Sequence, residues 1–236
     1  MENTFLKSTP VATPKVNFFA KTLLWFGYAL VLTFLIAFGI PGILYAAGVN
    51  EETFYTTLLV MCGIGGVGIF VFSLIIMIKS LRMRGLGVIT FTLYAIFMGL
   101  ALTPLYLLGS TPEGLLAIIY SVGVTGGIFV IMGLIGILSK GKIGVMWSLA
   151  LAFSIGAIIL SLVNFFIFSE TIYWICSFAI LLVFILYVGI DFAIIKAHPE
   201  NAANEFAILC AFRLYTNFIV IFIRLLPIIL KIMSKK

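Results

Sequence analysis

Residues 184–230 read FILYVGIDFAIIKAHPENAANEFAILCAFRLYTNFIVIFIRLLPIIL, and this stretch decides the fold. Two long apolar segments are joined there by a short polar turn, and each is long enough for a helix that crosses a bilayer. The first segment contains Asp191, and the second contains Arg213, Asn217 and Arg224. A charge at the centre of a membrane helix costs roughly 2.5 to 3.5 kcal/mol, so such groups pair, line water or mark a transport path. The stretch therefore predicts two facing membrane helices with a polar site between them.

The composition of the whole chain agrees with a membrane protein. Of its 236 residues, 64% are hydrophobic and 9% are charged, whereas about 25% are charged in an ordinary globular domain. This length holds about seven spans of roughly 20 residues. We therefore expect an all-α fold, a polytopic membrane protein with a seven-transmembrane helix bundle. A flexible cytoplasmic tail is expected over residues 1–17, which are polar, and a single seven-helix transmembrane domain over residues 18–236.

The apolar runs set the expected helices. Because runs this long and continuous can satisfy their backbone hydrogen bonds within lipid only as helices, all of them are interpreted as spanning helices. Proline removes a backbone donor, so Pro41-Gly42 predicts a kink or an interfacial break in the first span. The expected spans cover residues 18–47, 54–78, 85–108, 115–138, 143–168, 171–197 and 206–233.

The charged residues outside the spans predict the orientation of the chain. Lys and Arg occur before the first span and in alternate loops, while the intervening loops carry only acidic charges. By the positive-inside rule the N-terminus of this multi-pass protein is cytoplasmic. The basic positions are Lys7, Lys15, Lys21, Lys79, Arg82, Arg84, Lys140 and Lys142, and the acidic ones are Glu51, Glu52, Glu113 and Glu170.

The last apolar run leaves two alternatives. If it crosses fully, the C-terminal lysines lie outside, against the positive-inside rule; if it is re-entrant, they return to the cytoplasm. Its length of about 28 residues favours a full crossing. The net charge of +6 does not indicate nucleic acid as a partner, because the basic residues are scattered between apolar runs.

Small residues inside the spans predict close helix packing. GIGGVG at residues 63–68 lacks the strand and helix that flank a dinucleotide-binding loop. Gly123 and Gly127 have the GxxxG spacing that lets two helix backbones approach each other. We interpret both stretches as packing surfaces rather than ligand sites.

The polar residues of the last two spans are placed to meet. Asp191 lies seven residues before His198, and Arg213 lies eight residues after Glu205. At about 1.5 Å per residue, both side chains lie roughly 10 to 12 Å from the hairpin end. Tyr187, one turn before Asp191, could donate a hydrogen bond to its carboxylate.

The last helix carries a polar face. Arg213, Asn217 and Arg224 are at positions i, i+4 and i+11, which places them on one side of a helix. That side should point into the bundle, toward partners and water, rather than into lipid. We therefore expect the C-terminal helix to be central, with the earlier spans around it.

Two interpretations of this site remain open. An ion pair between Asp191 and Arg213 could simply fix the packing of the last two helices. Alternatively, Asp191 with Asn217 faces a water-filled path as a cation ligand or proton-responsive gate. Calcium takes six to eight oxygen ligands, so two residues do not make a metal site. His198, the only histidine, suits either a pH sensor or an exposed helix end.

Several stretches, taken in order, resemble one known family. They are NFFAKTLLWFGYALVLTFLIAF, GLGVITFTLYAIFMGLALTPLYLL, GGIFVIMGLIGILSKGKIGVMWSLALAFSIGAIILSLVNFFIF, ILYVGIDFAIIKA and FRLYTNFIVIFIRLLPIIL. Together they are similar to the Bax inhibitor family, also called the transmembrane Bax inhibitor motif family, and most of all to its bacterial members. The resemblance covers nearly the whole chain. It implies a seven-helix bundle around a central last helix, and a calcium leak across the membrane that pH regulates.

The resemblance also implies a pair of buried aspartates that share a proton and close the pore when neutral. Asp191 matches the first aspartate, but the second position is Asn217, within LYTNFIVIF. Two close carboxylates titrate as a coupled pair, and one carboxylate beside an amide does not. Arg213 adds a cation that favours the ionised carboxylate. Our hypothesis is that an Asp191–Arg213 pair replaces the shared proton, so that acid sensing is weakened or lost.

The expected function is a passive leak channel for calcium or other cations in a bacterial plasma membrane. Asp191, Asn217, Arg213 and Tyr187 are the candidates for its ion path and for any pH sensing that is retained, and Arg224 and His198 are secondary candidates. The alternative is a non-conducting protein that binds and modulates other membrane proteins, such as a protease or a transporter. Neither an enzyme nor a cofactor is expected, because no nucleophile is paired with a base. The partners expected are the lipid bilayer and calcium or other cations.

Overall fold

The computed structural model describes residues 17–78, 86–139, 143–197 and 204–234. Every regular element in these ranges is a helix, and six of the helices are long and apolar enough to cross a membrane. The expected tail, the basic loops and His198 lie outside the described residues. The elements are α1 (Phe18–Ala46), α2 (Glu51–Met77), α4 (Gly87–Ala101), α5 (Leu105–Gly109), α6 (Pro112–Leu138), α7 (Ile143–Ile167), α8 (Glu170–Ala197) and α9 (Asn204–Met233). The predicted all-helical, polytopic membrane fold is confirmed.

Local signals explain where two of these helices begin. The Asn50 side chain accepts a hydrogen bond from the Thr53 amide at the start of α2, and the Thr111 hydroxyl accepts one from Gly114 at the start of α6. Each satisfies an amide that has no partner within its helix. Pro112 then occupies the first turn of α6, where a missing N–H costs nothing.

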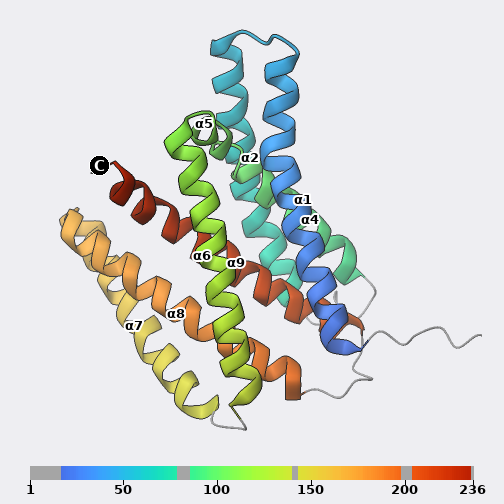
Figure 1. Cartoon of the computed structure of the whole chain (residues 1–236), viewed down its shortest axis with the longest axis vertical. Coiled ribbons are helices and arrows are strands. Elements are labelled where there is room, and N and C mark those ends of the chain that lie inside the picture. The colour runs from blue at the N-terminus through green and yellow to red at the C-terminus, as the bar shows by residue number, and fades with distance from the viewer. Residues whose placement is uncertain (1–16, 79–85, 140–142, 198–203, 235–236) are drawn as a thin grey trace, which may run out of the picture.

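The third expected span is broken. In place of one helix over residues 85–108, the chain forms the 15-residue α4, a turn at Leu102–Pro104 and the short α5. Pro104 has no N–H to donate to the Leu100 carbonyl, which accepts hydrogen bonds from the Thr103 hydroxyl and amide instead. α4 begins near the end of α2, and α5 lies beside the start of α6, so the two helices together cover the distance that one span was expected to cover (Figure 1). Conversely, the predicted break at Pro41 is absent, since α1 continues through it to Ala46.

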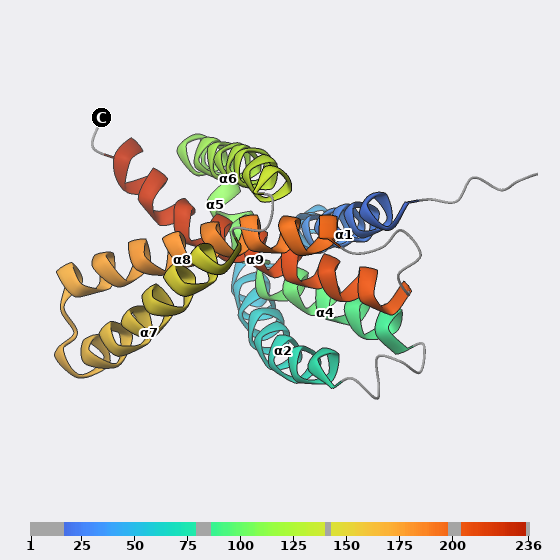
Figure 2. The same ribbon diagram turned by 90° about the horizontal axis from the view of Figure 1, so that it is seen from below.

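The last helix occupies the centre of the bundle. α9 contacts α1, α4, α6 and α8. In its most apolar 18-residue segment 61% of the residues are buried, a larger share than in any other candidate span. Figure 2 shows α9 passing between these helices, with α7 at the edge beside α8. The central position predicted from the polar face is therefore confirmed.

The full length of α9 favours the crossing alternative over the re-entrant one. The helix is continuous over 30 residues and includes Pro227. Near its end the Lys231 amine donates a 3.0 Å hydrogen bond to Glu170, the first residue of α8. α9 therefore reaches the end of the bundle where α8 begins.

Glycines allow close packing, though not where GxxxG predicted it. A Cβ at Gly123 or Gly127 would meet no atom within 4 Å, so that prediction is wrong within this chain. Farther along α6, Gly136 lies against the carbonyl group of Gly189 on α8, and a Cβ there would collide with backbone. In residues 63–68 the prediction holds in part: Gly65 and Gly68 lie against α4, whereas the other two glycines face open space.

Candidate functional site at Asp191

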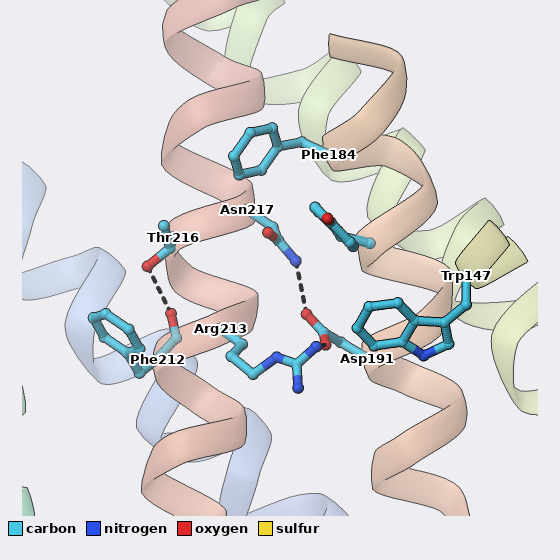
Figure 3. A pocket seen from close by; sticks show the side chains of 8 residues that line it. Trp147, Phe184, Asp191, Phe212, Arg213, Thr216 and Asn217 are labelled. Atoms are coloured by element: carbon cyan, nitrogen blue, oxygen red, sulfur yellow. Dashed lines mark hydrogen bonds and ion pairs between the residues drawn. The ribbon is translucent and has the colours of Figure 1, made fainter. Parts of the chain in front are cut away.

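Three polar side chains meet where α8 and α9 cross. The Arg213 Nη2 atom lies 2.6 Å from Oδ1 of Asp191, and the Asn217 amide donates a 2.7 Å hydrogen bond to Oδ2. Arg213 and Asn217 are one helical turn apart on α9, and both point toward α8 (Figure 3). The spacing from the hairpin therefore brings Asp191 and Arg213 to the same level, as expected.

The three residues differ in exposure. Asp191 is 3% exposed and Asn217 is 5% exposed, whereas the Arg213 side chain is 37% exposed. The contact of Oδ1 with Arg213 is an ion pair that lacks the alignment of a hydrogen bond. The carboxylate is thus fixed on its Asn217 side and held mainly by charge on its Arg213 side.

A cavity of about 270 Å³ lies beside this cluster. Its walls come from three helices: one side chain from α7, three from α8 and four from α9 (Figure 3). Arg213 and Asp191 supply the charges, and aromatic rings supply much of the remaining wall. The lining residues are Trp147, Phe184, Tyr187, Asp191, Phe212, Arg213, Thr216 and Asn217.

Tyr187 lines this cavity, but its hydroxyl is directed elsewhere. The Ser154 hydroxyl of α7 donates its proton to the Ala150 carbonyl, so it accepts the 3.2 Å hydrogen bond from the Tyr187 hydroxyl. The ring packs edge-on against Trp147 and Phe184, with centroids 6.2 and 6.0 Å away. The suggested hydrogen bond from Tyr187 to the Asp191 carboxylate is therefore not made. Tyr187 is part of an aromatic wall instead.

The secondary candidates do not join the cluster. Arg224 is partly buried on α9, about 10 Å along the helix from Asn217 at 1.5 Å per residue. The ion pairs found among the described residues do not include it. His198 lies outside the described ranges. Nor do three or more His, Cys, Asp or Glu side chains gather anywhere in those ranges.

The opposite side of α9 carries a second buried polar contact that sequence reasoning missed. The Tyr215 hydroxyl lies 2.6 Å from the Thr33 hydroxyl of α1, and Thr33 donates a 3.1 Å hydrogen bond to the Ala95 carbonyl of α4. Thr33 and Tyr215 are both fully buried. This contact joins three helices and holds the central one in register.

Trp147, Phe184 and Thr216 also lie at the site without having been predicted there. In the sequence they resemble any other interfacial or lipid-facing residues. Trp147 reaches the cavity only because α7 packs mainly on α8, and this brings the start of α7 to the level of Asp191. The sequence carries no signal for that register.

The chain matches a known protein family. The family model described as inhibitor of apoptosis-promoting Bax1 matches residues 15–235, which is nearly the whole length. The chain belongs to this Bax inhibitor family. Two curated relatives are named inner membrane protein YbhL, from Escherichia coli strains K12 and CFT073. Each is 25% identical over 237 aligned residues, which cover 95% of this chain and 97% of the relative.

The name of these relatives, inner membrane protein, agrees with the six helices of this chain that are long and apolar enough to cross a membrane. The protein is a multi-pass integral membrane protein. The Asp191 cluster brings a carboxylate, a guanidinium and an amide together within the spanning helices α8 and α9.

Proposed function

We propose that this protein is a passive leak pathway for calcium or other cations in a bacterial plasma membrane, closed by the Asp191–Arg213 ion pair. The observation that carries the proposal is the asymmetry of that pair: Asp191 is buried, while the Arg213 side chain is 37% exposed and borders a cavity. A buried acid within a spanning helix is the kind of group that marks an ion path.

Arg213 acts as a latch in this proposal. While its guanidinium neutralises Asp191, the site presents no net charge to an arriving cation. Separating a buried pair costs several kcal/mol because one charge is left alone. A cation that replaces the guanidinium removes that cost, so arrival of the ion and release of the latch are coupled.

Asn217 keeps the carboxylate in place when Arg213 leaves. Its amide nitrogen donates to Oδ2, and an amide has two donor hydrogens and an acceptor oxygen. The family resemblance implies a second acid at this position. With asparagine at this position, Asp191 and Asn217 cannot share a proton. Arg213 rather than a shared proton then opens and closes the site.

The same ion pair supports a second candidate. A guanidinium on the path repels cations, and a permanently closed pair would leave a non-conducting protein that binds and modulates a membrane protease or transporter. In that case Asp191 and Arg213 serve only to hold α8 against α9.

Calcium flux into liposomes that contain the purified protein separates the candidates. The variants are Arg213→Ser with Asn217→Asp, which restores the family pattern, and Arg224→Ser as a control that removes a cation from the same helix without touching Asp191. A silent wild type and a leaking double variant support the locked channel. A leak in the wild type means that Arg213 releases Asp191 on its own. Silence in both favours the modulator.

A further inference from the structure

The cavity beside Asp191 has the chemistry of a receptor for organic cations. Three aromatic side chains, Trp147, Phe184 and Tyr187, come from α7 and α8, and the buried carboxylate lies beside them. The face of an aromatic ring attracts a cation within about 6 Å, and rings around a cation are the usual receptor for ammonium groups. The carboxylate adds a full opposite charge.

The aromatic wall is formed before any ligand arrives. Tyr187 makes edge-to-face contacts with Trp147 and with Phe184, and its hydroxyl is hydrogen-bonded to Ser154. These contacts fix the ring from two helices. When the side chains that line a cavity are already ordered, ligand binding costs less conformational entropy.

Arg213 occupies the cation position as a ligand supplied by the chain itself. Its planar guanidinium is an organic cation on a flexible stem, held 2.6 Å from Oδ1. Because Asn217 is bonded to the other oxygen, Oδ2, Arg213 can move away without releasing the carboxylate. The Arg213 side chain is partly exposed and lines the cavity, so a competitor in the cavity can approach Oδ1 as Arg213 moves away.

We infer that this cavity binds a small organic ammonium or guanidinium ion with a short apolar body, which displaces Arg213 from Asp191. The volume of about 270 Å³ suits a small organic ion. A bare inorganic divalent ion uses oxygen ligands, of which the site offers few, and gains little from the aromatic wall. The inference deepens the proposed function by naming a ligand for the same site, yet binding can be measured without any flux.

The first experiment uses Trp147 as the reporter. The chain has three tryptophans, so Trp25→Phe with Trp174→Phe leaves Trp147 alone. Benzyltrimethylammonium is titrated into this protein in phosphatidylglycerol nanodiscs, and the fluorescence is followed. A saturable change is expected. Its neutral carbon isostere, neopentylbenzene, should give none; an equal response to the isostere would show a merely apolar cavity and overturn the inference.

Charge variants locate the binding. Arg213→Ser removes the internal competitor and should tighten binding roughly tenfold or more, because the site is then always open. Arg224→Ser, the matched control, should leave the affinity unchanged. Asp191→Asn combined with Arg213→Ser leaves no lone buried charge and should abolish binding. Saturable binding that survives in this double variant, or its absence in both wild type and Arg213→Ser, overturns the inference.

The same ammonium chemistry is available from water or from a lipid headgroup. Repeating the titration in nanodiscs that contain phosphatidylethanolamine distinguishes them. A weaker apparent affinity there means that the headgroup competes for the cavity, and an equal affinity means that the ligand comes from water. Flux without probe binding would overturn this inference alone, whereas binding without flux would overturn only the leak proposal.

Discussion

The guanidinium of Arg213 and the carboxylate of Asp191 lie 2.6 Å apart, on two helices that the chain connects through a hairpin. The acid is buried, and the base is exposed on one side to a cavity. This inequality makes the pair a candidate latch rather than a simple structural bridge, because one partner can leave while the other is retained by Asn217.

Loss of Arg213 alone should destabilise the protein. Arg213→Ser leaves the Asp191 charge buried without a counter-charge, and we expect a loss of about 2 kcal/mol, below the range for a fully buried pair because Arg213 is partly exposed. Asp191→Asn with Arg213→Ser should recover much of this loss. Thermal unfolding of the purified variants measures both, and equal melting temperatures for the single and double variants would refute a coupled pair.

Acid should have little influence on calcium flux in the wild type. The Asp191 oxygen that does not contact Arg213 is hydrogen-bonded to the amide of Asn217 rather than to a second carboxyl group, so no proton can be shared there. Flux in liposomes at about pH 6 and about pH 8 should therefore be similar. Arg213→Ser with Asn217→Asp should create a pH-dependent flux. A strong pH dependence in the wild type that disappears in Asp191→Asn would contradict this prediction.

Gly136→Ala should weaken the contact between α6 and α8. The added methyl group would collide with the Gly189 carbonyl, and overpacking of this kind costs about 1 to 3 kcal/mol. Gly127→Ala, on the same helix, meets open space and should be neutral or slightly stabilising. Comparison of the two melting temperatures tests the register of α6 on α8; equal values would mean that the close approach is elsewhere.

Thr33→Val should cost about 1 to 2 kcal/mol, because it leaves the buried Tyr215 hydroxyl without its Thr33 partner. The matched control is Thr22→Val, in the same helix and equally buried, whose hydroxyl donates a hydrogen bond to the Phe18 carbonyl one turn earlier. We expect this control to change stability less. If the two valine variants melt together, the contact of α1 with α9 does not depend on the hydroxyl pair.

Much of the helical framework could be predicted from the sequence. Five of the seven expected spans agree with a single helix to within a few residues at each end, and α1 agrees once the predicted break at Pro41 is removed. The exception is the expected span over residues 85–108, which is divided into α4 and α5. Its hydropathy predicts one continuous helix, but Pro104 and the Thr103 hydroxyl end α4. The meeting of Asp191 with Arg213 and Asn217 was also predicted correctly, because a charge in lipid needs a partner and few were available.

The sequence by itself determined that the protein is a helical membrane protein, that α9 is central, and that Asp191 meets Arg213. Each follows from a contrast between polar and apolar residues. Most other spans are apolar on every side, so no contrast tells which side faces a neighbour and which faces lipid. Only the tertiary structure could decide that Gly136 rather than Gly123 is in close contact, and that Trp147 and Tyr187 form the wall beside Asp191. In a membrane, lipid and protein interior are almost equally apolar. The shape of the packing surfaces therefore decides which side of a helix faces its neighbours, whereas in water hydrophobicity decides it.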